Sequence, residues 1–173
     1  MTTLFVCYGN DLIGNDGFGR AVYEALPDDV NKIFTVQLLP ELLEEIKGYE
    51  RLIFVDAAHG VGDVELYEIE PSNDDTADFH HLTPQTLLAL LDALYTKTPK
   101  SYICVGYFES FEVGEIDVDF DLKVSSVVSK ISVFRADTKI NNAQDEADMV
   151  VQEILASEQN PLYKDFSKNE YYK

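Results

Sequence analysis

Residues 8–19, with the sequence YGNDLIGNDGFG, place glycines and carboxylates directly after an apolar run. Gly-rich turns between a strand and a helix commonly bind phosphate. This turn contains Asp11 and Asp16 but no lysine, and it matches neither G-x-G-x-x-G nor a phosphate loop that ends in G-K-[ST]. Because carboxylates at a helix start repel phosphate, the turn favours a cation as its ligand.

Further residues of the same chemistry follow other apolar runs. Asp56 comes directly after RLIFV and is followed by His59. A second pair, His80 and His81, precedes a leucine-rich segment. Carboxylate and imidazole ligands together suit zinc, nickel or iron better than calcium. Two strand-end carboxylates and one histidine therefore predict a site for a divalent transition ion.

Each of these residues also has a simpler interpretation. Asp16 stands where a carboxylate could cap the following helix, and a histidine in a loop is often only an exposed surface residue. Asp56 is harder to explain in this way, because a carboxylate that abuts a buried strand is partly desolvated and needs a partner. The sequence leaves these alternatives open, and it favours a site when the residues are taken together.

Other chemistries have less support. A receiver-like signalling domain also places acidic residues after its first and third strands, around magnesium, but it would need a lysine where this chain has CVGYFES. The chain has no G-x-S-x-G nucleophile elbow. Cys7 and Cys104 lie in apolar runs without C-x-x-C spacing, which predicts buried and reduced thiols.

The composition narrows the class of protein further. The chain has 173 residues, 46% of them hydrophobic, which is enough for one domain with a real core. Its 32 acidic and 13 basic residues give a formal net charge of -19, which disfavours nucleic acids and anionic membranes as partners. No apolar stretch is long enough to span a bilayer, and the first residues lack the basic start of a signal peptide. We therefore expect a soluble, cytoplasmic protein.

Strands and helices are expected to alternate along most of the chain. Continuous apolar runs predict buried strands at residues 3–8, 32–39, 51–58 and 101–108, and an alternating run predicts an edge strand at 64–70. Apolar stripes predict helices at 17–26, 40–49 and 83–99, the last with Thr83 as its N-cap and Pro84 in its first position. This order predicts an α/β three-layer sandwich: a mainly parallel, twisted sheet of about five strands with helices on both faces.

The last third of the chain is harder to assign. Residues 124–134 have apolar positions at helical spacing, but their valine, serine and isoleucine content favours a strand. A final helix is expected at 141–157. We therefore expect a single α/β domain over residues 1–158, followed by a polar, aromatic tail at 159–173 that is mobile or docks elsewhere.

Three motifs, in this order and at these strand ends, resemble the hydrogenase maturation proteases. They are GNDLIGNDGFG after the first strand, FVDAA at the end of the third, and HHLTPQTLLALL at the start of a helix. The segment VQLLPELLEEI resembles the branch of this family that carries Q-x-x-P-E-L there. The resemblance spans about residues 3–114. It implies a nickel-dependent endopeptidase that removes the C-terminal peptide of a [NiFe] hydrogenase large-subunit precursor.

The resemblance also implies roles for individual residues. The metal ligands of the family correspond to Asp16, Asp56 and His80, with His81 and His59 as alternative ligands. The two aspartates are also the implied catalytic residues, which would make the protein an aspartic-type endopeptidase. The ion would be nickel, most simply that of the substrate, and zinc or cadmium could substitute for it.

The glycine turn has an implied role of its own. Gly9, Asn10 and Gly17 would form an open turn that lets the backbone of a peptide substrate approach closely. The implied partner is the large-subunit precursor. Two alternatives stay open at this point: a nickel-binding assembly chaperone without catalytic activity, and the receiver-like magnesium-binding domain.

Overall fold

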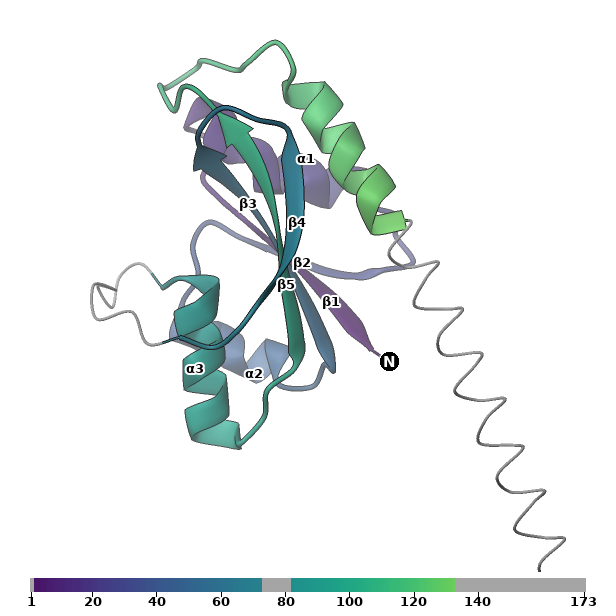
Figure 1. The fold of residues 1–173 in the computed structure, drawn as a ribbon, viewed down its shortest axis with the longest axis vertical. Coiled ribbons are helices and arrows are strands. Elements are labelled where there is room, and N and C mark those ends of the chain that lie inside the picture. Colours follow the sequence, from purple (N-terminus) through teal and green to yellow (C-terminus); the bar gives the residue numbers. More distant parts are fainter. Residues whose placement is uncertain (1, 73–81, 133–173) are drawn as a thin grey trace, which may run out of the picture. The chain divides into compact units, whose positions relative to one another are not determined.

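The computed structural model describes residues 2–72 and 82–132, and their strands form one five-stranded sheet in the order β2-β1-β3-β5-β4 (Figure 1). Neighbouring strands run parallel except for β4, which is antiparallel to β5. The strands are β1 (Thr3–Tyr8), β2 (Asn31–Thr35), β3 (Arg51–His59), β4 (Val64–Ile69) and β5 (Lys100–Phe108). The helices are α1 (Phe18–Ala25), α2 (Leu43–Ile46), α3 (Pro84–Tyr95) and residues 120–132, with 3₁₀ turns at Gly14–Gly17 and Pro40–Leu42.

The sequences of the three central strands are almost uniformly apolar because of the position of these strands in the sheet. β1, β3 and β5 each have a neighbour on both sides, and helices cover both faces, so successive side chains are buried whichever way they point. β4 lies at the edge of the sheet, as the sequence predicted, and only its end residues, Val64 and Ile69, are buried. The predicted three-layer α/β sandwich with a mainly parallel sheet is confirmed.

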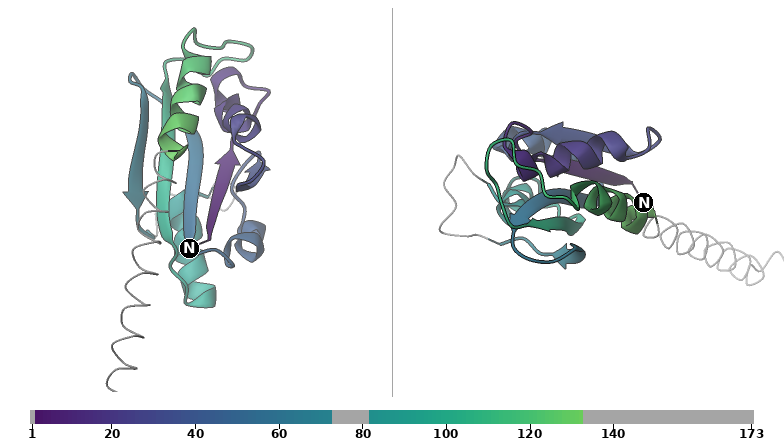
Figure 2. Two further views of the ribbon diagram at one scale, coloured as in Figure 1. Left: turned by 90° about the vertical axis from the view of Figure 1, so that its right-hand side faces the viewer. Right: turned by 90° about the horizontal axis from the view of Figure 1, so that it is seen from above.

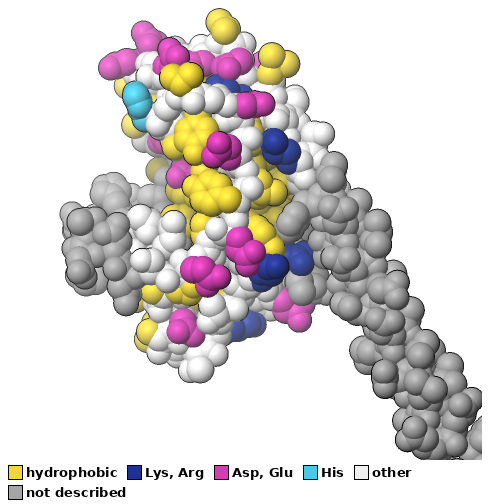
Figure 3. Space-filling model, in the orientation of Figure 1, with side chains coloured by type: hydrophobic (Ala, Val, Ile, Leu, Met, Phe, Trp, Pro, Cys, Tyr) yellow, Lys and Arg dark blue, Asp and Glu magenta, His cyan; other side chains and the backbone are white. Residues whose placement is uncertain are grey.

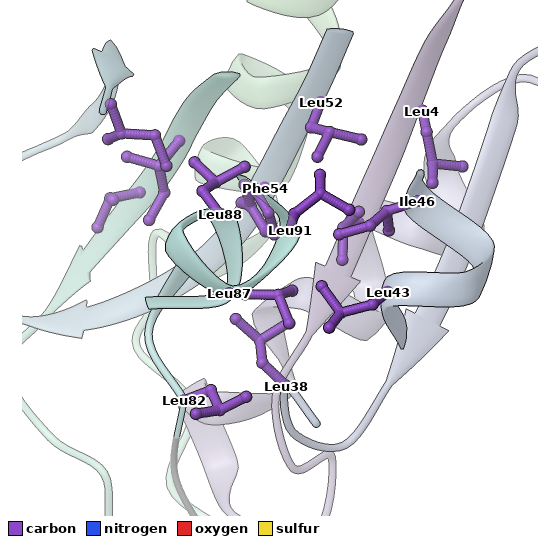
Figure 4. Close-up of a cluster of buried hydrophobic side chains, with 14 residues drawn as sticks. Leu4, Leu38, Leu43, Ile46, Leu52, Phe54, Leu82, Leu87, Leu88 and Leu91 are labelled. Atoms are coloured by element: carbon purple, nitrogen blue, oxygen red, sulfur yellow. The ribbon is translucent and has the colours of Figure 1, made fainter. Parts of the chain in front are cut away.

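One face of the sheet is covered by α2 and α3 through a leucine-rich core (Figure 4). Leu87, Leu88 and Leu91 of α3 repeat at helical spacing and are almost fully buried. They pack with Leu43 and Ile46 of α2 against the side chains of the central strands. The predicted start of α3 is confirmed, because the Thr83 hydroxyl accepts a hydrogen bond of 3.2 Å from the Thr86 amide.

The opposite face is covered by α1 and the helical residues 120–132, which lie side by side (Figure 2). Three aromatic rings join them to β5: Phe18 and Phe120 have centroids 5.9 Å apart, and each lies within 6 Å of Phe108. The strand favoured for 124–134 is wrong for its described part, which is helical up to residue 132. Apolar residues at helical spacing, such as Val127 and Ile131, are buried, and their burial in the tertiary structure outweighs the strand preference of β-branched residues.

The helices of the described residues include none that is both long and apolar enough to cross a membrane. The expected helix at 141–157 and the expected domain boundary at residue 158 lie outside the described residues.

Candidate functional site

The candidate site lies at the carboxyl ends of β1 and β3, where the order of the strands reverses. β2 pairs with one side of β1 and β3 pairs with the other, so the connections that leave these strands diverge. Open α/β sheets commonly bind ligands at this position. Cys7 pairs with Val55, which brings the next residues, Tyr8 and Asp56, side by side. The Tyr8 hydroxyl donates a hydrogen bond of 2.6 Å to Asp56 Oδ2.

A pocket of about 180 Å³ opens at this point. It is lined by Tyr8, Gly9, Asp16, Val36, Gln37, Leu38, Asp56 and Leu82. The structure therefore brings the two aspartates singled out in the sequence, one from the glycine turn and one from β3, to the same small cavity.

The carboxyl group of Asp56 has a raised pKa. Burial raises its pKa from 3.8 to about 6. Hydrogen bonds from the Tyr8 hydroxyl and from the Ala57 amide, 2.8 Å from Oδ1, hold this pKa down, while the charge of Asp16 raises it further. The pKa of Tyr8 is raised well above its ordinary value, first by burial and then by the neighbouring carboxylate of Asp56. Tyr8 therefore stays a proton donor to Asp56.

Asp16 lies in the 3₁₀ turn that leads into α1. Its Oδ2 accepts a hydrogen bond of 2.8 Å from the Asn10 amide, which ties the two ends of the turn together. The N-cap of α1 is Gly17, and no side chain caps this helix. The interpretation of Asp16 as a helix cap is therefore wrong: its carboxylate organises the turn and faces the pocket.

The glycines of the turn allow it to pack closely. Gly9 has a φ of 137°, and a Cβ there would lie 2.2 Å from the carbonyl oxygen of Asp16, so only glycine fits. Gly9 also lines the pocket, whereas Gly17 is buried next to the backbone of Asp11. Of the predicted substrate-access residues, Gly9 lines the pocket, whereas Asn10 and the buried Gly17 do not.

Of the three histidines, only His59 lies within the described residues. His59 ends β3 and is exposed, with its ring centroid 6.4 Å from that of Phe111, and it does not line the pocket. His80 and His81 lie outside the described residues. Within residues 2–72 and 82–132, no group of three or more His, Cys, Asp or Glu side chains is arranged to hold a metal ion.

The two carboxylates of the pocket nevertheless suit a cation. Asp16 and Asp56 face one cavity, and neither forms an ion pair with a lysine or arginine of the described residues. Two partly buried carboxylates without a positive partner repel each other, and this repulsion adds a smaller contribution to the pKa of Asp56, which burial raises most. A divalent ion bound by both would relieve this repulsion.

Sequence reasoning missed two residues of this region. In the sequence Tyr8 is only the end of an apolar run, although a polar-tipped aromatic residue directly before a glycine turn is a usable signal. Asn15 was not singled out at all, yet its side chain is completely buried. Its partners are about a hundred residues away in the sequence, so no local pattern could have indicated them.

A larger groove of about 490 Å³ also lies at the carboxyl end of the parallel strands. It is lined by Gly60, Val61, Gly62, Glu109, Ile116, Asp117, Val118, Asp119 and Lys123. Figure 3 shows acidic and hydrophobic side chains interspersed over this end of the molecule. The buried ammonium group of Lys123 lies 2.9 Å from a carboxylate oxygen of Asp119 and donates to the carbonyl of Tyr107. The one buried charge of this groove is therefore neutralised.

Comparison with known proteins supports the expected fold. The structure is similar to a [NiFe] hydrogenase maturation protease, HybD, from Thermococcus kodakarensis, with a TM-score of 0.61 and 20% identity over 78% of this chain and 99% of that one. It is similar to the hydrogenase maturating endopeptidase HybD from E. coli, with a TM-score of 0.62 and 19% identity over 79% and 94% of the two chains. It is also similar to the maturation protease HycI from Thermococcus kodakarensis KOD1, with a TM-score of 0.59 and 17% identity over 75% and 89%.

Sequence comparison alone is less informative. No known family profile and no curated protein matches the chain. The structural likenesses, at identities near 20%, establish that the chain has the fold of the hydrogenase maturation proteases.

Proposed function

We propose that this protein is a metal-dependent endopeptidase that removes the C-terminal peptide of a [NiFe] hydrogenase large-subunit precursor in the cytoplasm. The observation that carries the proposal is the pair of carboxylates, Asp16 and Asp56, facing one pocket at the strand-order reversal of this fold. The likeness to solved structures named as hydrogenase maturation proteases supports it. Nickel is then part of the substrate, and zinc or cadmium can take its place in a binding experiment.

The residues that would hold the ion are Asp16, Asp56 and His80. The first two line the pocket, and Leu82, which follows His80 and His81 in the sequence, lines it as well. A divalent ion in such a site supplies Lewis acidity toward a carbonyl oxygen and lowers the pKa of bound water.

The chain's own groups supply proton transfer and orientation. In the metal-free protein the pKa of Asp56 is about 6, so its carboxyl group can accept or release a proton close to neutral pH when it is not bound to the ion. The Tyr8 hydroxyl and the Ala57 amide each hold one oxygen of this carboxylate. Asp16 is fixed separately by the Asn10 amide. Two carboxylates that are held independently can divide the roles of ligand and base.

The test is processing of a nickel-loaded large-subunit precursor, followed by mass spectrometry of the large subunit. We expect the wild-type protein to remove one C-terminal peptide. The variants Asp16→Ala, Asp56→Ala and His80→Ala should not. Asp63→Ala, which removes an exposed carboxylate outside the pocket, is the matched control and should process normally.

Two results would contradict the proposal. Stable binding of the precursor without removal of any peptide would favour an assembly chaperone. Processing that continues in both aspartate variants would show that the pocket is not the active site.

A further inference from the structure

Asn15 is one of the few completely buried polar side chains among the described residues. Its Nδ2 donates two hydrogen bonds of 2.8 Å, one to the carbonyl of Ser110 and one to Oδ1 of Asp117. Its Oδ1 accepts a third, of 2.9 Å, from the Asp117 amide. Both amide hydrogens are therefore used, and the geometry suits asparagine: an ionised aspartate has no donor, and an alanine side chain has neither donor nor acceptor.

These bonds join the glycine turn to the segment that follows β5. Gly14, the preceding residue, packs against the same segment: a Cβ there would lie 2.1 Å from the carbonyl oxygen of Glu115, and its φ of 43° also favours glycine. Asp117 is held in turn, since its Oδ2 accepts a bond of 3.3 Å from the Glu109 amide. The turn thus rests on a segment that is itself anchored.

Asp16 comes directly after Asn15 and is constrained from the other side. Its amide donates to the carbonyl of Ile13 at 2.8 Å, and its carboxylate accepts from the Asn10 amide. Gly9 packs closely against the carbonyl of Asp16, which constrains the next peptide group as well. Asp16 is therefore held between the end of β1 and the segment after β5, and Asn15 makes the polar contacts on the second side.

We infer that Asn15 is a positioning residue that keeps the carboxylate of Asp16 in the pocket by locking the turn to residues 110–117. The structural part of this inference stands without the proposed function. Only its consequence for metal binding rests on that function. Buried hydrogen-bonded side chains are costly to remove, because the partners left behind lose their bonds without regaining water.

The first experiment is hydrogen exchange of the Asn10 amide in metal-free protein, compared with that of Phe54 in the central strand. Asn15→Ala should lower the protection of Asn10 at least tenfold relative to Phe54, because the carboxylate that accepts its hydrogen bond moves. Ser101→Ala, which removes a buried side-chain bond at the opposite end of β5, is the matched control and should leave this ratio unchanged. An unchanged ratio in Asn15→Ala would overturn the inference.

Two further variants keep the experiment decisive if Asn15→Ala does not fold. Asp117→Ala removes only one of the three bonds and should give a smaller change of the same sign. Asn15→Asp places two carboxylates opposite each other, and it should be as harmful as alanine at pH 8. Adding Asp117→Asn to it restores a donor between the two positions and should recover part of the Asn10 protection. No recovery would count against the link.

The second experiment is calorimetric titration with cadmium. Asn15→Ala should bind cadmium at least tenfold more weakly than the wild type, whereas Ser101→Ala should bind equally well. Equal affinity of Asn15→Ala and the wild type would overturn the positioning role. If the wild type binds no cadmium, the proposed metal site fails, while the exchange of the Asn10 amide still decides the role of Asn15.

Discussion

Two cavities lie at the carboxyl end of the parallel strands. They differ in whether their buried charged groups have partners of opposite charge. The larger groove contains the buried Lys123, which is paired with Asp119 and the carbonyl of Tyr107. The smaller pocket contains Asp16 and Asp56, for which the described residues supply hydrogen-bond donors but no ion pair. The buried cation of the groove is thus paired with a carboxylate, whereas the two carboxylates of the pocket have no cationic partner among the described residues.

The presence or absence of a partner of opposite charge indicates function better than the size of either cavity. A buried charge with a partner contributes to the fold alone, whereas desolvated carboxylates that lack a positive partner make the empty site unfavourable until a ligand arrives. The carboxyl end of the sheet therefore contains a structural ion pair in the groove and a candidate binding site in the pocket. Variants in the two cavities should have opposite consequences.

The largest expected difference is in activity. Asp56→Ala should lower the rate of precursor processing by about 10³-fold, within the range for loss of a general acid or base. Asp119→Ala in the groove should change the rate by less than about threefold. The measurement is single-turnover processing followed by mass spectrometry. Comparable losses in both variants would show that the distinction between the cavities is wrong.

The next difference concerns stability against pH in metal-free protein. The pKa of Asp56 is about 6 in the folded protein and 3.8 in the reference state, so the folded protein binds more protons between these values. Stability therefore falls as the pH rises from about 4 through 6. Asp56→Asn lacks this loss and can keep both hydrogen bonds, since the Tyr8 hydroxyl can also accept.

The comparison is urea unfolding of the wild type and Asp56→Asn in the presence of a chelator. The variant should be more stable than the wild type by up to about 3 kcal/mol at pH 8 and nearly equal to it at pH 4. A variant that is less stable at pH 8 would show that Asp56 is not under electrostatic strain in the folded protein.

A smaller effect of opposite sign is expected in the groove. Asp119→Ala leaves the buried ammonium of Lys123 without its carboxylate and should destabilise the protein by about 1–2 kcal/mol. Asp121→Ala, which removes an exposed carboxylate two residues further along the chain, at the start of the helix at 120–132, is the control and should have little effect. Urea unfolding at pH 7 measures both. A neutral Asp119→Ala would mean that Lys123 needs no ion pair.

Much of the fold could be predicted from the sequence because its elements are locally encoded. The apolar runs of the central strands and the Thr83–Pro84 start of α3 determine the alternation of strands and helices. Residues 124–132 were misassigned because β-branched side chains favour strands locally, while the aromatic cluster around Phe108 that stabilises the helix is brought together only by the tertiary structure.

The candidate site was predictable only in part for a related reason. Asp16 and Asp56 follow apolar runs and could be singled out, since the carboxyl ends of parallel strands share one edge. The hydrogen bonds of Tyr8 and Asn15 join segments that are far apart in the sequence. Their roles depend on the pairing of β1 with β3 and on the path of the chain after β5, which local patterns do not specify.

The most direct test of the central claim is thermal unfolding with nickel, zinc, cadmium or magnesium added separately. A transition ion at a hundred times its dissociation constant should stabilise the wild type by about 2.7 kcal/mol, which corresponds to a rise of roughly 5–10 °C. The account predicts this rise for nickel, zinc and cadmium, its loss in Asp16→Ala and Asp56→Ala, and its retention in Asp119→Ala. A preference for magnesium, or an undiminished rise in both pocket variants, would contradict it.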